Sequence, residues 1–237
     1  MITMSNLGNN GRLGNQIFQF AFLYSLHKLN GYEYCIPPNT DLAECFDLTC
    51  NTCSQLNLPK EKEKHFHFDR MFPNKFKNNV DYTGYYQSDK YFNKIKQELF
   101  TVLKFKNQHK KPLPDNNLVS IHIRRGDYVG NDVHPVVSLD YITRAKQHFE
   151  NKKFLVFSDD IQWCKENKLG DLYSDGNTHY QDLYQMSLCC GSIIANSSFS
   201  WWGAYLSPKQ KVIAPKKWFS TNTLKTDDLY CNNWIVI

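Results

Sequence analysis

The sequence lacks the runs and motifs that mark several large protein classes. No stretch of roughly 18 apolar residues occurs in its 237 residues, so no membrane-spanning helix or anchor is expected. The phosphate loop G-x-x-x-x-G-K-[ST] and the nucleophile elbow G-x-S-x-G are absent, which argues against a P-loop NTPase and an α/β-hydrolase. There is also no internal repeat or low-complexity tract. These absences leave an ordinary globular protein.

The sequence also has no large excess of positive or negative charge. Lys and Arg number 28 against 23 Asp and Glu, a net charge of +5, and the lysines are scattered. A nucleic-acid binder needs a basic stripe, so this is the least favoured class, and we expect no nucleic-acid partner. A modest positive balance suits an anionic ligand such as a nucleotide diphosphate.

The eight cysteines do not follow a leader-like segment, because Met1–Asn10 has no basic start with a long apolar run. We therefore expect a reducing, cytoplasmic setting with free thiols. Cys50 and Cys53 form one C-x-x-C, and His65 and His67 are the nearest further zinc ligands. A single such pair indicates structural zinc only weakly.

Strands and helices alternate along the chain, which predicts an α/β protein with a parallel, doubly wound sheet. The predicted strands are Ile2–Ser5, Val80–Tyr86, Leu118–Ile123, Phe154–Phe157, Ser192–Ala195 and Lys211–Ala214. The predicted helices run from Ile17 to Asn30, Ser88–Leu103, Ser138–Glu150, Ile161–Asn167, Gln181–Cys190 and onward from Ser197. Loops and short elements are expected from Pro37 to Asn79, and a linker at Lys104–Asn117.

Three predicted strands end in polar motifs, at the edge where a parallel sheet binds ligands. The motifs are His122–Asp127, Ser158–Asp160 and Asn196–Ser200. Arginine is permanently charged and its planar fork fits phosphate oxygens, so Arg124 or Arg125 could stabilise a departing diphosphate. The alternative is a structural ion pair, for example Arg125 with Asp127. Successive strand residues point opposite ways, so we expect one arginine in each role.

The other polar residues have simpler alternatives. Ser197 and Ser198 precede a helix whose free N–H groups suit phosphate. The alternative is that either serine simply caps that helix. Asp159 could accept hydrogen bonds from a ribose or guanine, or cap the next helix, and His122 alone is more often a packed core histidine. No Asp-x-Asp pair lies at a strand end, so we expect no metal and no cofactor, with Arg124 in the cation's place.

Six blocks of sequence resemble one known family. They are GRLGNQIFQFA (Gly11–Ala21), GYYQSDKYF (Gly84–Phe92), VSIHIRRGDYV (Val119–Val129), FLVFSDDIQWCKEN (Phe154–Asn167), DLYQMSLCCGSIIANSSFSWWGAYLS (Asp182–Ser207) and KVIAPKKWF (Lys211–Phe219). In this order they resemble glycosyltransferase family 11, the α-1,2-fucosyltransferases, over nearly the whole chain. The stretch from about Asn39 to Asn78 matches poorly, and part of an acceptor site could lie there.

The resemblance implies a glycosyltransferase-B type fold, with two Rossmann-like domains facing across a cleft. We place an N-terminal acceptor-side domain at 1–112 and a GDP-fucose-binding domain at 113–237, whose last residues could pack back on the first. The resemblance further implies GDP-β-L-fucose as donor, a glycan acceptor such as a terminal β-galactose, inversion to an α-fucoside, and no required metal.

The family's motifs also suggest roles for individual residues. Arg124 is expected on the donor diphosphate, and Asp127 is our first choice as general base, although it could instead hold Arg125 or a turn. Asn15 is expected at the reaction centre. The remaining expected donor-binding residues are Gly14, Gln16, His122, Ser158, Asp159, Asn196, Ser197, Ser198 and Phe199.

Two alternatives stay open. A fucosyltransferase of another linkage, α-1,6 or protein O-linked, would share the arginine motif and the GRLGNQ-like loop. A non-catalytic GDP-sugar-binding or lectin-like module would bind GDP-fucose without transferring or hydrolysing it. Linkage analysis of a product distinguishes the first alternative from an α-1,2-fucosyltransferase. A turnover assay distinguishes the second from an enzyme.

Overall fold

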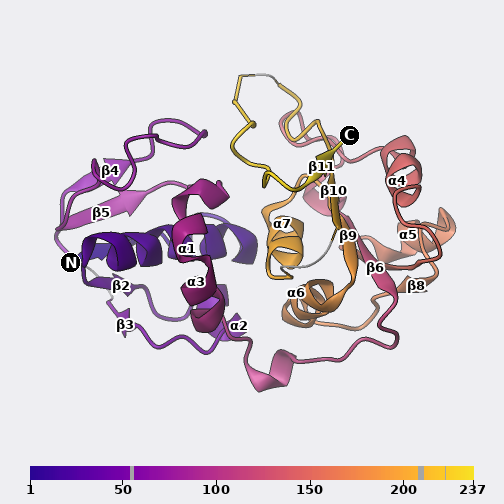
Figure 1. Ribbon diagram of the computed structural model, residues 1–237, viewed down its shortest axis with the longest axis horizontal. Helices are drawn as coiled ribbons and strands as arrows, with labels where there is room; N and C mark the ends of the chain where they lie inside the picture. Colours follow the sequence, from indigo (N-terminus) through magenta and orange to yellow (C-terminus); the bar gives the residue numbers. More distant parts are fainter. Residues whose placement is uncertain (54–55, 208–210, 222) are drawn as a thin grey trace. The chain divides into compact units, whose positions relative to one another are not determined.

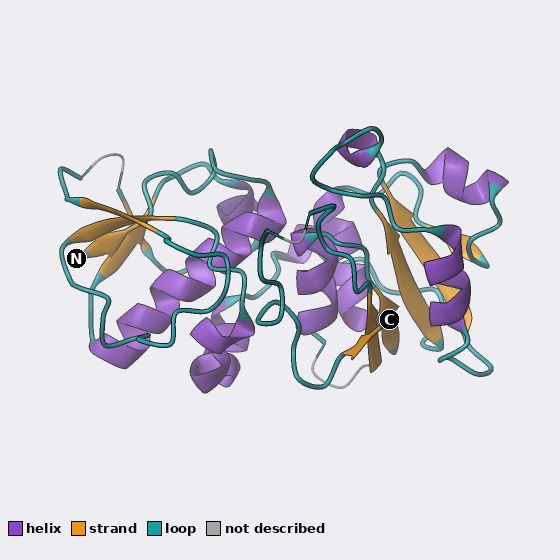
Figure 2. Ribbon diagram, turned by 90° about the horizontal axis from the view of Figure 1, so that it is seen from above, coloured by secondary structure: helices purple, strands orange, loops and turns teal. Residues whose placement is uncertain are grey.

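The computed structural model describes residues 1–53, 56–207, 211–221 and 223–237. The chain forms two compact units: unit 1 is Met1–Lys106 with Leu224–Cys231, and unit 2 is Asn107–Thr223 with Asn232–Ile237. Each unit packs helices on a parallel sheet (Figures 1 and 2), as the alternation of elements predicted. The first segment of unit 1 ends at Lys106, where the predicted domain boundary was at residue 112. Among the described residues, no helix has both the length and the apolar character that crossing a bilayer requires.

The sheet of unit 1 has five short parallel strands in the order β3-β2-β1-β5-β4. They are β1 (Ile2–Thr3), β2 (Tyr34–Ile36), β3 (Asn51–Thr52), β4 (Lys60–Lys62) and β5 (Val80–Thr83). Only β1 and β5 were predicted, and both are shorter than predicted. Strands β3 and β4 expose most of their side chains, so they carry little of the apolar pattern by which a strand is predicted.

Helix α1 (Leu13–Asn30) is the main helix of unit 1 and is buried on most sides. It ends at Gly31, whose φ of 72° fits the left-handed cap that glycine favours. Phe22 of α1 stacks flat on Tyr86 with ring centroids 3.7 Å apart, within a cluster of Phe and Tyr rings. Many aromatic side chains of unit 1 therefore fill its core.

The predicted single helix over Ser88–Leu103 is wrong. The segment consists of two 3₁₀ turns, η1 (Asp89–Tyr91) and η2 (Asn93–Ile95), followed by α3 (Lys96–Val102). Phe92 and Ile95 leave helical backbone angles and are both buried. These two residues interrupt the helix while their side chains stay in the core, which leaves short turns before α3. The remaining helix of unit 1 is α2 (Asp41–Cys45).

Unit 2 has a six-stranded parallel sheet in the order β11-β10-β9-β6-β7-β8. The strands are β6 (Leu118–Ile123), β7 (Lys153–Ser158), β8 (Leu172–Tyr173), β9 (Gly191–Ile193), β10 (Lys211–Ala214) and β11 (Ile235–Val236). The predicted β6 and β10 agree with the structure residue for residue. The helices are α4 (Leu139–Lys146), α5 (Ile161–Glu166), α6 (His179–Leu188) and α7 (Ser198–Tyr205), with short 3₁₀ turns η3 (Asn107–His109) and η4 (Gly126–Tyr128).

The helices of unit 2 cover both faces of its sheet (Figure 1). Alternate residues of β6 pack toward α4 and α5, as Val119, Ile121 and Ile123 do. The intervening residues face the other way, where Leu118 packs with Met186 of α6. This alternation also turns His122 toward α7.

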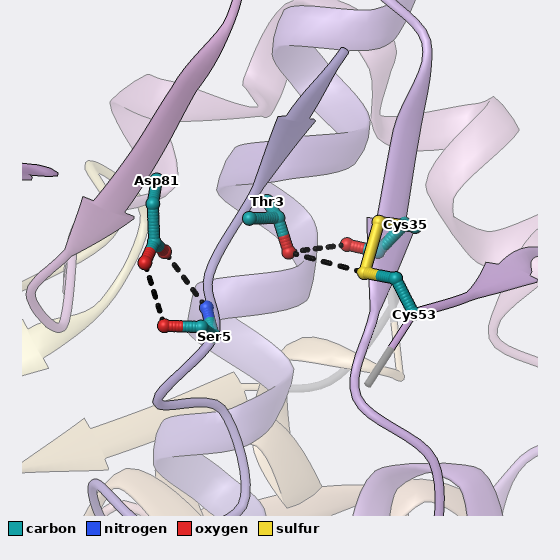
Figure 3. The surroundings of a disulfide bond; sticks show 5 residues. All are labelled: Thr3, Ser5, Cys35, Cys53 and Asp81. Atoms are coloured by element: carbon teal, nitrogen blue, oxygen red, sulfur yellow. Dashed lines mark hydrogen bonds between the residues drawn. A yellow bond between two sulfur atoms is a disulfide. The ribbon is translucent and has the colours of Figure 1, made fainter. Parts of the chain in front are cut away.

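Cys35 and Cys53 form a disulfide (Figure 3), so the expectation that all the thiols are free is wrong. Parallel pairing of β2 with β3 sets Cys35 opposite Asn51 and brings its Cα to 5.8 Å from that of Cys53. Thr3 of β1 donates a hydrogen bond to the carbonyl of Cys35. Neighbouring strands therefore bring together two cysteines 18 residues apart. The disulfide also removes Cys53 from the weakly indicated zinc site.

Candidate functional site

Three polar motifs of unit 2 lie at the carboxyl ends of neighbouring strands. Strand β6 leads into Arg124–Asp127, β7 into Asp159 and Asp160, and β9 toward Asn196, with β9, β6 and β7 adjacent in the sheet. Because all three strands are parallel, these residues share one edge of the sheet. An edge of this kind is the usual ligand site of a doubly wound sheet.

Arg124 lies between two carboxylates at this edge. Its Nε and Nη2 are 2.8 and 2.6 Å from Asp127 Oδ1, and its Nη1 is 2.9 Å from Asp159 Oδ2. The side chain keeps 17% exposure, so the guanidinium is fixed but still reaches the surface. A guanidinium carries five N–H donors, and these contacts leave one on Nη1 and one on Nη2.

Arg125 points away from Arg124 and makes a different ion pair. Its Nε is 2.9 Å from Asp160 Oδ2, and its guanidinium lies 3.8 Å from the ring centre of Trp163. The alternative pairing of Arg125 with Asp127 is therefore not the one formed. Stacked and paired in this way, Arg125 joins the strand end to α5.

Asp159 holds the backbone of the arginine motif. Besides contacting Arg124, its Oδ1 accepts a hydrogen bond of 2.8 Å from the backbone N–H of Arg125. A Cβ at Gly126 would come within 2.7 Å of Asp159 Oδ2, so a larger residue there would displace this carboxylate. Asp160, in contrast, accepts from Trp163 N and caps α5, while Ser158 Oγ accepts from Asp160 N.

His122 is buried, with 5% exposure, and its Nδ1 has no hydrogen-bond partner among the described residues. Burial lowers the pKa of its imidazole to about 4, so the ring is neutral at neutral pH. Its ring centre is 5.5 Å from that of Phe199 on α7. An unpaired buried nitrogen is uncommon and is available to a ligand or water.

The Asn196–Phe199 segment mainly organises the start of α7. Asn196 is buried and donates to the carbonyls of Pro135 and Trp218, both at 2.9 Å. Ser197 caps α7 through a bond from Phe199 N to its Oγ. Ser198 is the first residue of the helix. Asn196 therefore has a structural part here, and the helix start carries the free backbone N–H groups.

Gly14, Asn15 and Gln16 lie in unit 1, in the first turn of α1 rather than in the predicted loop. Gln16 is buried, with its side chain bonded to Gly11 O and to Leu42 N. Asn15 is half-buried, and its Oδ1 accepts a bond of 2.7 Å from Gln87 Nε2. Of the three, Asn15 is the residue whose side chain is accessible.

The family model for Glycosyl transferase family 11 matches residues 1–237. The chain belongs to glycosyltransferase family 11. An Escherichia coli alpha-1,2-colitosyltransferase is 32% identical, with 96% of each chain covered. Galactoside alpha-(1,2)-fucosyltransferase 2 of Sus scrofa is 25% identical over 83% of this chain and 68% of its own length.

Solved structures show the same fold for this family 11 chain. A NodZ alpha-1,6-fucosyltransferase soaked with GDP-fucose matches 91% of the chain and 95% of its own, with 13% identity and a TM-score of 0.56. POFUT1 in complex with GDP matches 88% and 95%, with 12% identity and a TM-score of 0.53. The predicted glycosyltransferase-B type architecture is thus confirmed.

The sequence analysis of this chain did not identify Gln87, Glu63 or Trp163 as residues that support the site. Gln87 lies within the Gly84–Phe92 block, so its motif was a usable signal. Glu63 lies in the stretch without clear pattern, and its partners, the backbone N–H groups of Tyr85 and Tyr86, are brought to it only by the tertiary fold. Among the described residues, no group of three or more His, Cys, Asp or Glu side chains is arranged to hold a metal ion.

Proposed function

We propose that this glycosyltransferase moves L-fucose from GDP-β-L-fucose to a glycan hydroxyl with inversion, and that the acceptor is the 2-OH of a terminal β-galactose. The observation that carries the proposal is Arg124, fixed at the ligand edge of the unit 2 sheet with two N–H groups to spare. The name of the α-1,2-fucosyltransferase relative supports the linkage and the galactoside acceptor, and the structural neighbour soaked with GDP-fucose supports the donor.

In the proposed reaction, the bond between the fucose C1 and the GDP β-phosphate oxygen breaks while the acceptor oxygen attacks C1 from the opposite face. Arg124 and the backbone N–H of Ser198 at the start of α7 take up the negative charge of departing GDP. Asp127 takes the proton of the acceptor hydroxyl. Arg124 here supplies the positive charge that a divalent ion supplies elsewhere, so we expect no metal requirement.

The donor-side assignments follow the same logic. His122 Nδ1 has no partner in the described part of the chain, so we assign it to the nucleoside, with Phe199 beside it. Asp159 would accept from guanine or ribose. Asn15 in unit 1 is assigned to the reaction centre, through its accessible amide.

The first experiment is a donor and acceptor panel. Purified protein is incubated with GDP-fucose or GDP-colitose and a set of β-galactosides, with EDTA or with Mg²⁺, and the products are read by mass and linkage. Formation of an α-1,2-fucoside at the same rate in EDTA is expected. An α-1,6 product, a metal requirement, or GDP binding without turnover would each reject part of the proposal.

The second candidate donor is a colitose nucleotide. It is favoured because an alpha-1,2-colitosyltransferase matches nearly the whole chain. The same panel decides between the two, since the preferred donor gives the higher kcat/KM at equal acceptor concentration. Either result keeps the leaving-group role of Arg124.

Variants test the two roles at Arg124 and Asp127. Arg124→Ala should lower kcat by about 100-fold or more, in the range seen when one charge-stabilising donor is lost. Asp127→Asn removes a carboxylate that competes with phosphate for Arg124, so GDP should bind as well or better while transfer falls. If both GDP affinity and transfer fall, Asp127 only positions Arg124. Arg144→Ala is the matched control, because Arg144 pairs with Asp140 on the exposed face of α4.

A cytoplasmic location also stays a prediction. The Cys35–Cys53 disulfide removes the argument from free thiols, since such bonds favour oxidising compartments. Fractionation of the producing cells, with thiol labelling of the recovered protein, tests the location and the bond together.

A further inference from the structure

The side chains of Asn15 and Gln87 meet in unit 1 although they lie 72 residues apart. Gln87 Nε2 donates a hydrogen bond of 2.7 Å to Asn15 Oδ1, and Gln87 is only 8% exposed. Asn15 makes no hydrogen bond through Nδ2 to any described residue. One end of the Asn15 amide is thus held, and the other end is an unused donor.

The loop that carries Gln87 is fixed by a half-buried carboxylate. Glu63 accepts hydrogen bonds from the backbone N–H groups of Tyr85 at 2.7 Å and Tyr86 at 3.1 Å. Tyr86 has a φ of 51° and its ring stacks on Phe22. A positive φ at a bulky residue persists only where the surroundings hold it, so Gln87 extends from a rigid support.

A second buried amide joins this loop to the loop before α1. Gln19 is fully buried, and its Nε2 donates to Gly84 O at 3.0 Å and to Asn10 O at 3.1 Å. On the other side of Asn15, a Cβ at Gly11 would lie 2.2 Å from Asn15 Nδ2. Asn15 is therefore bounded on one side by Gly11 and on the other by Gln87.

An asparagine amide can rotate by half a turn and present either its oxygen or its nitrogen. We infer that Gln87 is a positioning residue that sets this choice: by occupying Oδ1, it makes Asn15 present the Nδ2 donor to the bound sugar nucleotide. This inference rests on the proposed function, in which Asn15 contacts the reacting sugar nucleotide. A donor presented in a fixed orientation suits an oxygen that gains negative charge during transfer.

Two substitutions at Gln87 separate orientation from packing. Gln87→Met keeps length and shape but offers no N–H, so Asn15 is no longer oriented. Gln87→Glu puts a carboxylate where the donor was and draws Asn15 Nδ2 toward itself, which turns Oδ1 outward. We expect kcat to fall about 10-fold in Gln87→Met and further in Gln87→Glu, with the KM for the sugar nucleotide changed less than 3-fold.

A double-mutant cycle shows whether Gln87 acts through Asn15. Gln87→Met should lower kcat about 10-fold in the wild-type background and less than 2-fold in the Asn15→Ala background. Tyr85→Phe is the matched control from the same loop: its exposed side chain makes no hydrogen bond among the described residues, so kcat should not change. All variants are compared at temperatures where circular dichroism shows them folded.

The outcomes separate the two proposals. Equal losses of kcat in both backgrounds would mean that Gln87 acts on the fold alone, and the inference is then overturned while transfer by the wild type stands. Absence of transfer from every GDP-sugar by the wild type would instead defeat the proposed function. A readout without turnover tests the geometry: the Gln87 side-chain N–H₂ resonances should shift in Asn15→Ala, and unchanged resonances contradict the contact.

Discussion

Asp159 Oδ2 lies 2.9 Å from Arg124 Nη1, so the carboxylate that follows β7 orients the guanidinium that follows β6. The pair is partly buried, with 25% and 17% of the side chains exposed. Asp159 also holds the backbone of Arg125. One side chain therefore supports both the charge and the backbone of the motif, and its loss should affect stability and chemistry together.

Asp159→Asn and Asp159→Ala should differ in a defined way. Asn keeps an oxygen for Arg125 N but removes the charge, so we expect a loss of about 1 kcal/mol in the free energy of unfolding. Ala also removes the acceptor of the exposed Arg125 N–H, which adds roughly 0.5–1.5 kcal/mol. Chemical denaturation measures both losses. Equal stability of the two variants would show that the backbone hydrogen bond contributes nothing.

The buried, neutral His122 should make the protein sensitive to acid. In the unfolded chain histidine protonates near pH 6.5, whereas burial lowers the pKa of His122 to about 4 in the fold. The unfolded state then binds more protons, so stability is complete above about pH 6.5 and falls as the pH drops toward 4, by about 3 kcal/mol in all. His122→Phe should lack this part of the pH dependence in denaturation curves. An unaltered profile in the variant would place the acid sensitivity elsewhere.

The sequence predicted the features that arise from local interactions along the chain. The pattern of β6 was sufficient, because six consecutive residues are buried and Gly126 follows. Ser197, a predicted cap, and Ser138, where a helix was predicted to begin, both cap their helices, because capping is a local interaction: each accepts a hydrogen bond from the backbone of its helix. The motif at Arg124 likewise marked a strand end directly.

Other features depend on contacts between distant residues and left no local pattern. Cys35 and Cys53 meet only because β2 and β3 pair in one register. Glu63 is held by two backbone N–H groups about 20 residues later in the chain, a partner that composition does not reveal. The Asn15–Gln87 contact has the same origin, so one expected residue could be named while the residue that orients it could not.

Glu63 should destabilise the protein as the pH rises. Burial raises the pKa of its carboxyl from 4.5 to about 7, against the opposing effect of the hydrogen bonds from Tyr85 and Tyr86. The folded state therefore binds the extra proton, and this part of the stability is complete below about pH 4.5 and is lost as the pH rises through 7, by about 3 kcal/mol in all. Glu63→Gln keeps an acceptor for only one of the two N–H groups but does not titrate, so its stability relative to the wild type should improve as the pH rises toward 8.

The His122 and Glu63 effects oppose each other between about pH 4.5 and 6.5, so the wild-type profile alone separates neither. The quantity to measure is the difference in unfolding free energy between each variant and the wild type at each pH. For Glu63→Gln this difference should grow in favour of the variant from pH 4.5 to 7. A difference that stays constant with pH contradicts the prediction.

Gly11→Ala should disturb Asn15 more than any loss of backbone freedom explains. Gly11 has a φ of 98°, and a Cβ there would lie 2.2 Å from Asn15 Nδ2 and 2.7 Å from Asn15 Cβ. Because the Cβ of Asn15 is fixed to α1, rotation of the amide cannot relieve the clash, so the contact with Gln87 should be lost.

Gly31→Ala is the matched control, since Gly31 also has a positive φ, of 72°, but nothing lies within 4 Å of its added Cβ. We expect about 1 kcal/mol of destabilisation in the control with normal turnover, and roughly 2–3 kcal/mol in Gly11→Ala with kcat lowered at least 10-fold. Denaturation and transfer assays on the two variants decide, and equal effects would mean that the space above Gly11 has no part in placing Asn15.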